Sequence, residues 1–282
     1  MHFQLNDEQR AGLRRVLQHA KFELIPLKNV LDQAKYLPQG ATVSVTASPV
    51  KTLEDTWDLA ASLQQMGFVV VPHLSARMTK DRAHLERLLK RLDELDIHSV
   101  FLVGGDAQDP GEFVDAMSVL RAMDDIGHRL THIGVTAYPD GHTSIPDESL
   151  RQALHDKQPY AAYMTTQMCF DHEKIGSWLK GTRRDGITMP VVFGIPGVAD
   201  RLKLMTISAR IGVGQSARFL SKNSSLITRF IKPGGYSPAE LLEPMANMFV
   251  SETANVAGLH IYTFNQCDTT ERWRQEYLAD LT

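Results

Sequence analysis

Apolar runs and amphipathic stripes alternate along most of the chain. Residues 100–103 form an apolar run that breaks at Gly104 and Gly105, which predicts a strand buried on both faces, as in parallel sheets. The segment from Thr79 to Leu95 has apolar residues at helical spacing with charges between them, which predicts an amphipathic helix. Similar apolar runs predict strands at residues 22–25, 42–47, 68–71, 132–137, 163–168, 191–195 and 258–262.

Helix start signals fall between these runs. Thr52 and Asp55 form a capping-box pattern, in which each side chain can satisfy a free backbone N–H of the first turn. Asp109, Pro110 and Glu112 offer a cap, a first-turn proline and an acid for another helix. Further helices are expected at residues 7–20, 28–36, 146–158, 172–183, 199–210, 215–230, after Ser237, and at 268–281.

The predicted strand ends recur about every 30 residues, which is the length of one βα unit. Eight such units in 282 residues predict a closed (β/α)8 TIM barrel, with a doubly wound open sheet as the alternative. The barrel would have an N-terminal helix and an extra helical segment between its seventh and eighth strands. No linker or shift in composition divides the chain, so residues 1–282 are expected to form a single barrel domain.

Composition narrows the classes of function. The formal net charge is -3 and the basic residues are scattered, which argues against a nucleic-acid partner. No apolar run approaches the roughly 20 residues of a membrane span, and the polar N-terminus does not resemble a secretory signal. A cytoplasmic location is therefore expected, with Cys169 and Cys267 as free thiols. No metal-ligand spacing is present.

Two carboxylates at strand ends are candidates for chemistry. Glu23 is the only charge in its apolar strand, and poor solvation there would favour the protonated carboxyl of a general acid. The structural alternative is a glutamate bonded to backbone at the barrel rim. Asp106 follows two glycines at the end of a buried strand, where α/β sheets place their ligands. Its structural alternative is a helix cap or an Asx turn.

Seven short motifs lie at these strand ends: Phe22-Glu23-Leu24-Ile25-Pro26, Ser44-Val45-Thr46, Pro72-His73-Leu74, Gly104-Gly105-Asp106, Ala137-Tyr138-Pro139-x-x-His142, Thr166-Gln167-x-x-Phe170-Asp171 and Tyr262-Thr263-x-Asn265. In type and order they resemble the motifs of methylenetetrahydrofolate reductases. The resemblance runs from Phe22 to about Asn265. It implies a barrel that reduces 5,10-methylenetetrahydrofolate to 5-methyltetrahydrofolate with NADH or NADPH, usually through bound FAD, in one-carbon metabolism and methionine biosynthesis.

The resemblance also implies roles for the matching residues. Glu23 matches the family's general acid, which helps to open the substrate's five-membered ring to an iminium. Asp106 matches the carboxylate near the flavin and the pterin, and Gln167 matches a folate contact. The implied flavin contacts are Thr46, His73, Gly105, Asp106, Tyr138 and His142, with Lys157 near the flavin phosphates.

Two departures from the family pattern fall on flavin contacts. Gly104 stands where the family commonly has arginine, and residues 158–163 lack the usual Ala-Gly-Ala-Asp-like turn. FAD is therefore expected to bind more weakly than is usual in the family. Direct hydride transfer from NAD(P)H without flavin is one alternative, and a folate- or flavin-binding barrel that serves methyl transfer is another. The expected partner is a small-molecule folate, and assembly into a homo-oligomer is left open.

Overall fold

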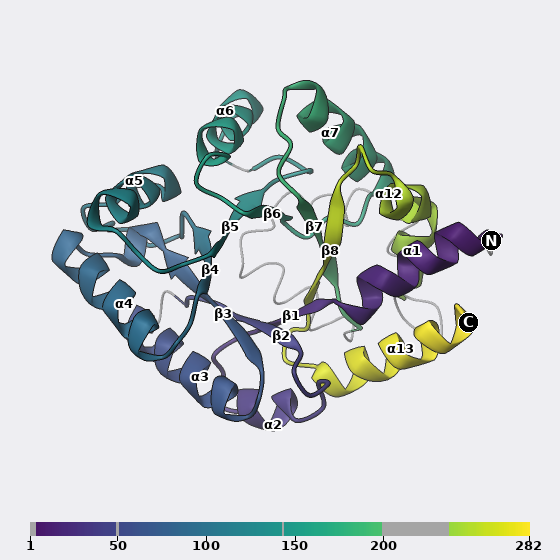
Figure 1. The fold of residues 1–282 in the computed structure, drawn as a ribbon, viewed down its shortest axis with the longest axis horizontal. Helices are drawn as coiled ribbons and strands as arrows, with labels where there is room; N and C mark the ends of the chain where they lie inside the picture. The colour runs from purple at the N-terminus through teal and green to yellow at the C-terminus, as the bar shows by residue number, and fades with distance from the viewer. Residues whose placement is uncertain (1–3, 49–50, 143, 199–236) are drawn as a thin grey trace.

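Eight parallel strands close into a barrel that is surrounded by helices in the computed structural model (Figure 1). The structure describes residues 4–48, 51–142, 144–198 and 237–282. β1 pairs with both β2 and β8, which confirms the TIM barrel and excludes the open sheet. The strands are β1 (Lys21–Leu24), β2 (Thr42–Val45), β3 (Val69–Ser75), β4 (Ser99–Val103), β5 (His132–Ala137), β6 (Tyr163–Thr166), β7 (Val191–Pro196) and β8 (Val256–Tyr262).

The helices follow the strands in alternation, as the sequence predicts. They are α1 (Asp7–Gln18), α2 (Val30–Ala34), α3 (Leu53–Gln65), α4 (Arg82–Glu94), α5 (Ala116–Ile126), α6 (Asp147–Lys157), α7 (His172–Arg184), α11 (Ala239–Leu242), α12 (Ala246–Val250) and α13 (Cys267–Asp280), with 3-10 turns η1 (Ala76–Met78) and η2 (Glu243–Met245). The helices expected at 199–210 and 215–230 lie outside the described residues. Among the described residues, no helix is both long and apolar enough to cross a bilayer.

Local signals explain where several helices begin. The hydroxyl of Thr52 accepts a hydrogen bond from Asp55 N, and the Asp55 carboxylate accepts one from Thr52 N, so the capping box before α3 is confirmed. The apolar stripe of α4 is buried, including Leu85 and Leu92. The helix expected after Ser237 is instead divided into α11, η2 and α12, and Pro244 lies in the 3-10 turn, where it cannot donate a helical hydrogen bond.

The predicted cap at Asp109 is wrong. α5 begins at Ala116, and its cap is Asp115, whose carboxylate accepts from Ser118 N at 2.8 Å. The segment containing Glu112 packs instead on the loop before α4, where Glu112 N donates to Lys80 O at 2.7 Å. This long-range contact outweighs the local helix-start signal.

The predicted end of the third strand is also wrong, because β3 continues through Pro72 to Ser75. Pro72 is the last residue of β3 in register with β2, and the pairing with β4 starts at His73. The missing N–H of the proline therefore falls where the strand changes its partner. This extension carries His73 and Ser75 to the C-terminal end of the barrel.

Alternate residues of each strand face the barrel interior. In β1, Phe22 and Leu24 belong to the hydrophobic core between barrel and helices, whereas Lys21 and Glu23 occupy the other face. Lys21 lies at the N-terminal end of β1, and its Nζ is 3.7 Å from the centre of the Tyr163 ring. Burial lowers the pKa of Lys21 to about 8. The interior is therefore polar at both ends, and the C-terminal end, the mouth, carries the candidate site.

Candidate active site

The Glu23 carboxyl is flanked by two imidazoles at the barrel mouth. Its Oε2 atom is 3.2 Å from Nε2 of His260 and 3.7 Å from Nε2 of His73. The three side chains are 13%, 3% and 9% exposed, in the order Glu23, His260 and His73. One carboxyl group and two imidazoles, from β1, β3 and β8, thus form a cluster that is largely shielded from solvent.

His73 is held in its neutral form within this cluster. Burial lowers its pKa to about 4, and the neighbouring His260 adds to this effect while Glu23 opposes it. Ser44 Oγ lies 2.8 Å from His73 Nε2 and also donates to Val71 O at 3.2 Å. His73 can therefore share a hydrogen bond with Ser44 or Glu23 near neutral pH without adding a positive charge.

The end of β1 is fixed by residues that follow β8. Thr263 Oγ1 donates to Glu23 O at 2.6 Å. The Asn265 side chain accepts from Ile25 N at 2.9 Å and donates to Ile25 O at 2.8 Å. These hydrogen bonds join the end of β8 to the end of β1 and hold the backbone that carries Glu23. The resemblance to the family includes Thr263 and Asn265 in a motif but implies no role for them.

Gln167 follows β6 and meets Tyr262 of β8 at the mouth. The Tyr262 hydroxyl is 3.2 Å from Gln167 Oε1 and 3.1 Å from Thr166 O. Tyr262 is in register with Glu23, so Gln167 lies one side chain away from the Glu23 cluster. Burial raises the pKa of Tyr262 well above its usual value, and Glu23 and Tyr138 add to the shift.

Asp106 is exposed on the loop after β4. Gly105 has a φ of +86°, and a Cβ there would lie 2.0 Å from Ser75 Oγ, so the loop needs glycine to pass close over β3. Arg77 Nε supports the loop by donating to Ala107 O at 2.7 Å. Since Asp115 caps α5, the structure excludes Asp106 as the cap of that helix.

Tyr138 connects the two sides of the mouth. Burial raises the pKa of Tyr138; a hydrogen bond with Thr136 opposes this shift and the charge of Asp106 adds to it. The His142 ring packs edge-on against Tyr138, with ring centres 5.3 Å apart. Tyr138 directly follows β5 and Tyr262 ends β8, so both side chains come from the C-terminal ends of strands. Thr46 lies half-buried just beyond the end of β2, and its N–H donates to Leu24 O.

Lys157 lies apart from this group. It is the last residue of α6, which starts after β5 at the mouth and runs towards the opposite end of the barrel. The side chain is buried, and burial lowers its pKa to about 8. Among the described residues, Asp115 is the acid that opposes this shift. A buried ammonium of this kind suits an anionic ligand group.

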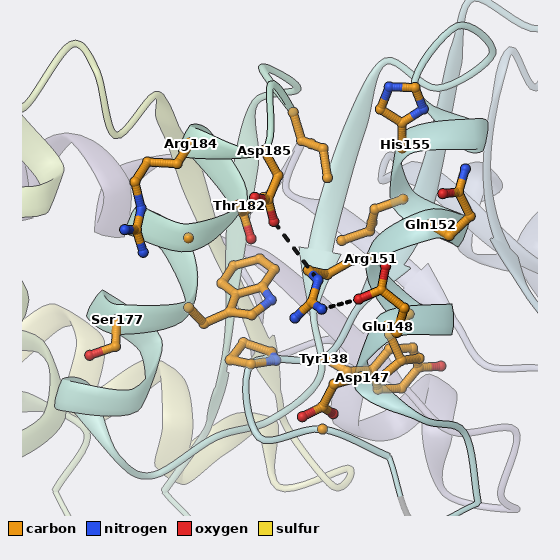
Figure 2. Close-up of a pocket in the computed structure, with 17 residues that line it drawn as sticks. Tyr138, Asp147, Glu148, Arg151, Gln152, His155, Ser177, Thr182, Arg184 and Asp185 are labelled. Atoms are coloured by element: carbon orange, nitrogen blue, oxygen red, sulfur yellow. Dashed lines mark hydrogen bonds and ion pairs between the residues drawn. The ribbon is translucent and has the colours of Figure 1, made fainter.

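A cleft of about 640 Å³ lies between α6 and α7 on the outer side of the barrel and borders the mouth at Tyr138 (Figure 2). Arg151 projects into it and forms ion pairs with Glu148 on its own helix and with Asp185 across the cleft. Trp178 and Tyr138 also line the cleft. The sequence did not predict this cleft, whose Arg151 is already paired with two carboxylates.

Sequence reasoning gave no role to His260, Tyr262 or Ser44. The alternation of Gly258, His260 and Tyr262 in β8 places all three on one face, which is a signal that could have identified two of them. Within the described ranges, no group of three His, Cys, Asp or Glu side chains is placed to hold a metal ion. Cys169 and Cys267 are both buried free cysteines.

This chain resembles known proteins both in sequence and in fold. A family model described as methylenetetrahydrofolate reductase matches residues 26–273. Methylenetetrahydrofolate reductase 1 of Schizosaccharomyces pombe is 28% identical over 120 residues, which cover 39% of this chain and only 20% of that relative. The match therefore spans about a fifth of the length of the relative.

Two solved structures show how far the likeness of fold extends. The spore cortex-lytic enzyme SleL of Bacillus cereus is 10% identical with a TM-score of 0.52, covering 91% of this chain and 73% of that one. Dihydropteroate synthase (FolP) of Thermus thermophilus is 15% identical with a TM-score of 0.47, covering 94% of each chain. The likeness to SleL shows the fold alone. The match over residues 26–273 extends across most of the barrel, and the chain belongs to the methylenetetrahydrofolate reductase family.

Proposed function

We propose that this protein is an oxidoreductase that reduces 5,10-methylenetetrahydrofolate to 5-methyltetrahydrofolate, with NADH or NADPH as donor and FAD as the hydride relay. The observation that carries the proposal is the Glu23 carboxyl at the barrel mouth, held between His260 and His73. Membership of the reductase family supports the class of reaction.

The cluster suits the first chemical requirement of this reaction. The closed five-membered ring must open to an iminium, and this requires a proton on the departing ring nitrogen. Glu23, which is 13% exposed and hydrogen-bonded to His260, is a general acid largely shielded from water. Hydride addition to the iminium carbon then gives the methyl group, so the substrate gains one proton and one hydride.

The residues present fit a flavin at the mouth. An aromatic surface for the flavin is offered by Tyr138 and by the His142 ring that packs against it. A Cβ at Gly104 would meet nothing within 4 Å, so a ligand can approach the backbone there. Lys157, which the resemblance places near the flavin phosphates, lies at the end of α6 remote from the mouth and is left out of this proposed site. Thr46, His73 and Gly105 complete the proposed flavin contacts, and Gln167 and Asp106 the proposed folate contacts. Bound FAD would carry hydride from the nicotinamide to the folate.

Glu23→Gln tests the proposal, because the amide keeps the shape and hydrogen bonding of Glu23 but cannot supply the proton. We expect folate reduction to fall by about 100-fold or more, while reduction of bound flavin by NAD(P)H is retained. Glu276→Gln, which changes an exposed acid near the end of α13, away from the mouth, is the matched control. Near-normal folate reduction in Glu23→Gln would refute the assignment, and loss of both half-reactions would indicate a structural role.

Titration of the apoprotein with FAD tests the cofactor. We expect weak, non-covalent binding, because a charge-assisted hydrogen bond from an arginine at position 104, worth about 1.5–3 kcal/mol, is missing. Turnover without FAD binding would favour direct hydride transfer. Binding of FAD or folate without any turnover would favour a barrel that serves methyl transfer.

A further inference from the structure

The side-chain oxygen of Gln167 receives two hydrogen bonds. Met168 N donates to Gln167 Oε1 at 3.3 Å, and the Tyr262 hydroxyl lies 3.2 Å from the same atom. A backbone N–H can only donate, so the oxygen of the amide faces Met168. The single proton of the Tyr262 hydroxyl is then shared between two acceptors, Gln167 Oε1 at 3.2 Å and Thr166 O at 3.1 Å. The two contacts together decide which end of the amide faces the protein.

The amino end of the Gln167 amide is left for a ligand. Gln167 is half-buried at the mouth, close to the Glu23 cluster, and its Nε2 has no acceptor among the described residues. We propose that Tyr262 is a positioning residue, which locks the Gln167 amide so that its amino group donates to a carbonyl or ring-nitrogen acceptor of the bound heterocycle. This inference rests on the proposed function, in which that heterocycle is the pterin of a reduced folate.

Tyr262 is well placed for this role because its ring is fixed independently of its hydroxyl. The ring packs over Gly194, where a Cβ would lie only 2.7 Å from Tyr262 Cε2, and its centre is 4.9 Å from that of His260. Burial raises the pKa of Tyr262 well above its usual value, so the hydroxyl keeps its proton across the working pH range. Tyr262→Phe therefore removes the donor and leaves the packing in place.

The hydroxyl also lies 3.1 Å from Thr166 O, so a purely structural role has to be distinguished. The side-chain NH2 signals of Gln167, identified by their loss in Gln167→Ala, report on the lock without any ligand. In the native protein we expect one distinct pair of signals in a ¹⁵N–¹H spectrum. In Tyr262→Phe we expect the pair to broaden or move towards the position of a freely rotating amide. An unchanged pair would overturn the lock.

Binding of 5-methyltetrahydrofolate, measured by calorimetry, tests the consequence. We expect Tyr262→Phe to weaken binding by about 3- to 10-fold, the usual range for one hydrogen bond. If Tyr262 acts through Gln167, Tyr262→Phe should have no further effect in the Gln167→Ala background. Tyr163→Phe, at the opposite end of β6, is the matched control and should bind normally.

Two results would overturn the inference in different ways. Equal weakening by Tyr262→Phe in the native and Gln167→Ala backgrounds would show that Tyr262 acts through the Thr166 carbonyl or the fold. Native protein that binds no 5-methyltetrahydrofolate would overturn both the folate contact and the proposed function, while the amide signals would still decide whether the lock exists.

Discussion

Replacing His73 by glutamine should flatten the dependence of stability on pH. His73 is buried at the barrel mouth, and its pKa is lowered to about 4 from the usual 6.5. In the unfolded chain the imidazole is free to take up a proton below about pH 6.5. Between about pH 4 and 6.5 the unfolded chain therefore binds more protons than the folded protein, and stability must fall as the pH is lowered through this window.

The size of the effect follows from the two pKa values. One pKa unit corresponds to about 1.4 kcal/mol, so the difference between 6.5 and about 4 is worth about 3 kcal/mol of unfolding free energy. This contribution is present in full above about pH 6.5 and is lost by about pH 4. His73→Gln removes the titrating group, although it also loses the contact with Phe101, whose ring centre lies 4.9 Å away. The packing loss shifts the whole curve and leaves its slope unaffected.

Urea unfolding measured from pH 4 to pH 8 separates the slope from the offset. We expect the native protein to lose about 3 kcal/mol more than His73→Gln between pH 7 and pH 4. His128→Gln, which changes an exposed histidine outside the barrel, should retain the native slope. An unchanged slope in His73→Gln would show that His73 is not held neutral by burial, and the reasoning about the Glu23 cluster would fail with it.

Two further predictions concern other buried or strained positions. Burial of the charged Lys21 side chain destabilises the fold; this penalty is present in full below its folded pKa of about 8 and disappears as the pH rises towards 10.5. Lys21→Met should therefore raise the unfolding free energy at pH 7 by up to about 3 kcal/mol, measured by urea unfolding, and the gain should shrink above pH 8. An equal gain at pH 10.5 would contradict this account. Gly105→Ala should cost about 1–2 kcal/mol in urea unfolding and lower folate reduction by displacing Asp106, because its φ is +86° and a Cβ would meet Ser75 Oγ. Gly104→Ala, whose Cβ meets nothing within 4 Å, should be tolerated, and equal costs at the two glycines would refute the strain argument.

Local patterns were enough to predict the order of the elements and the barrel class. The capping pair Thr52 and Asp55 marks the start of α3, and the buried stripe of α4 appears in the sequence as helical spacing. These features depend on residues within one or two turns of each other, so the sequence records them directly. The choice of a closed barrel followed from the number and spacing of the units, which is also a property of the chain in order.

Other features depended on contacts that local patterns do not record. Asp109 and the residues after it match the sequence pattern of a helix start. Their segment packs instead on the loop before α4, and α5 begins later, with Asp115 as its cap. The role of His260 beside Glu23 was missed, because the two residues are 237 positions apart and meet only when β8 pairs with β1.

The sequence thus identifies some residues of the candidate site, and the tertiary structure decides what surrounds them. Glu23, Asp106 and Gln167 could be singled out by residue type and by position at strand ends. Their surroundings could not, since closure of the barrel decides that two imidazoles flank Glu23 and that Tyr262 meets Gln167. The physical reason is that a side chain's proton affinity and orientation are set by its burial and its neighbours in space, and in a closed barrel those neighbours come from opposite ends of the chain.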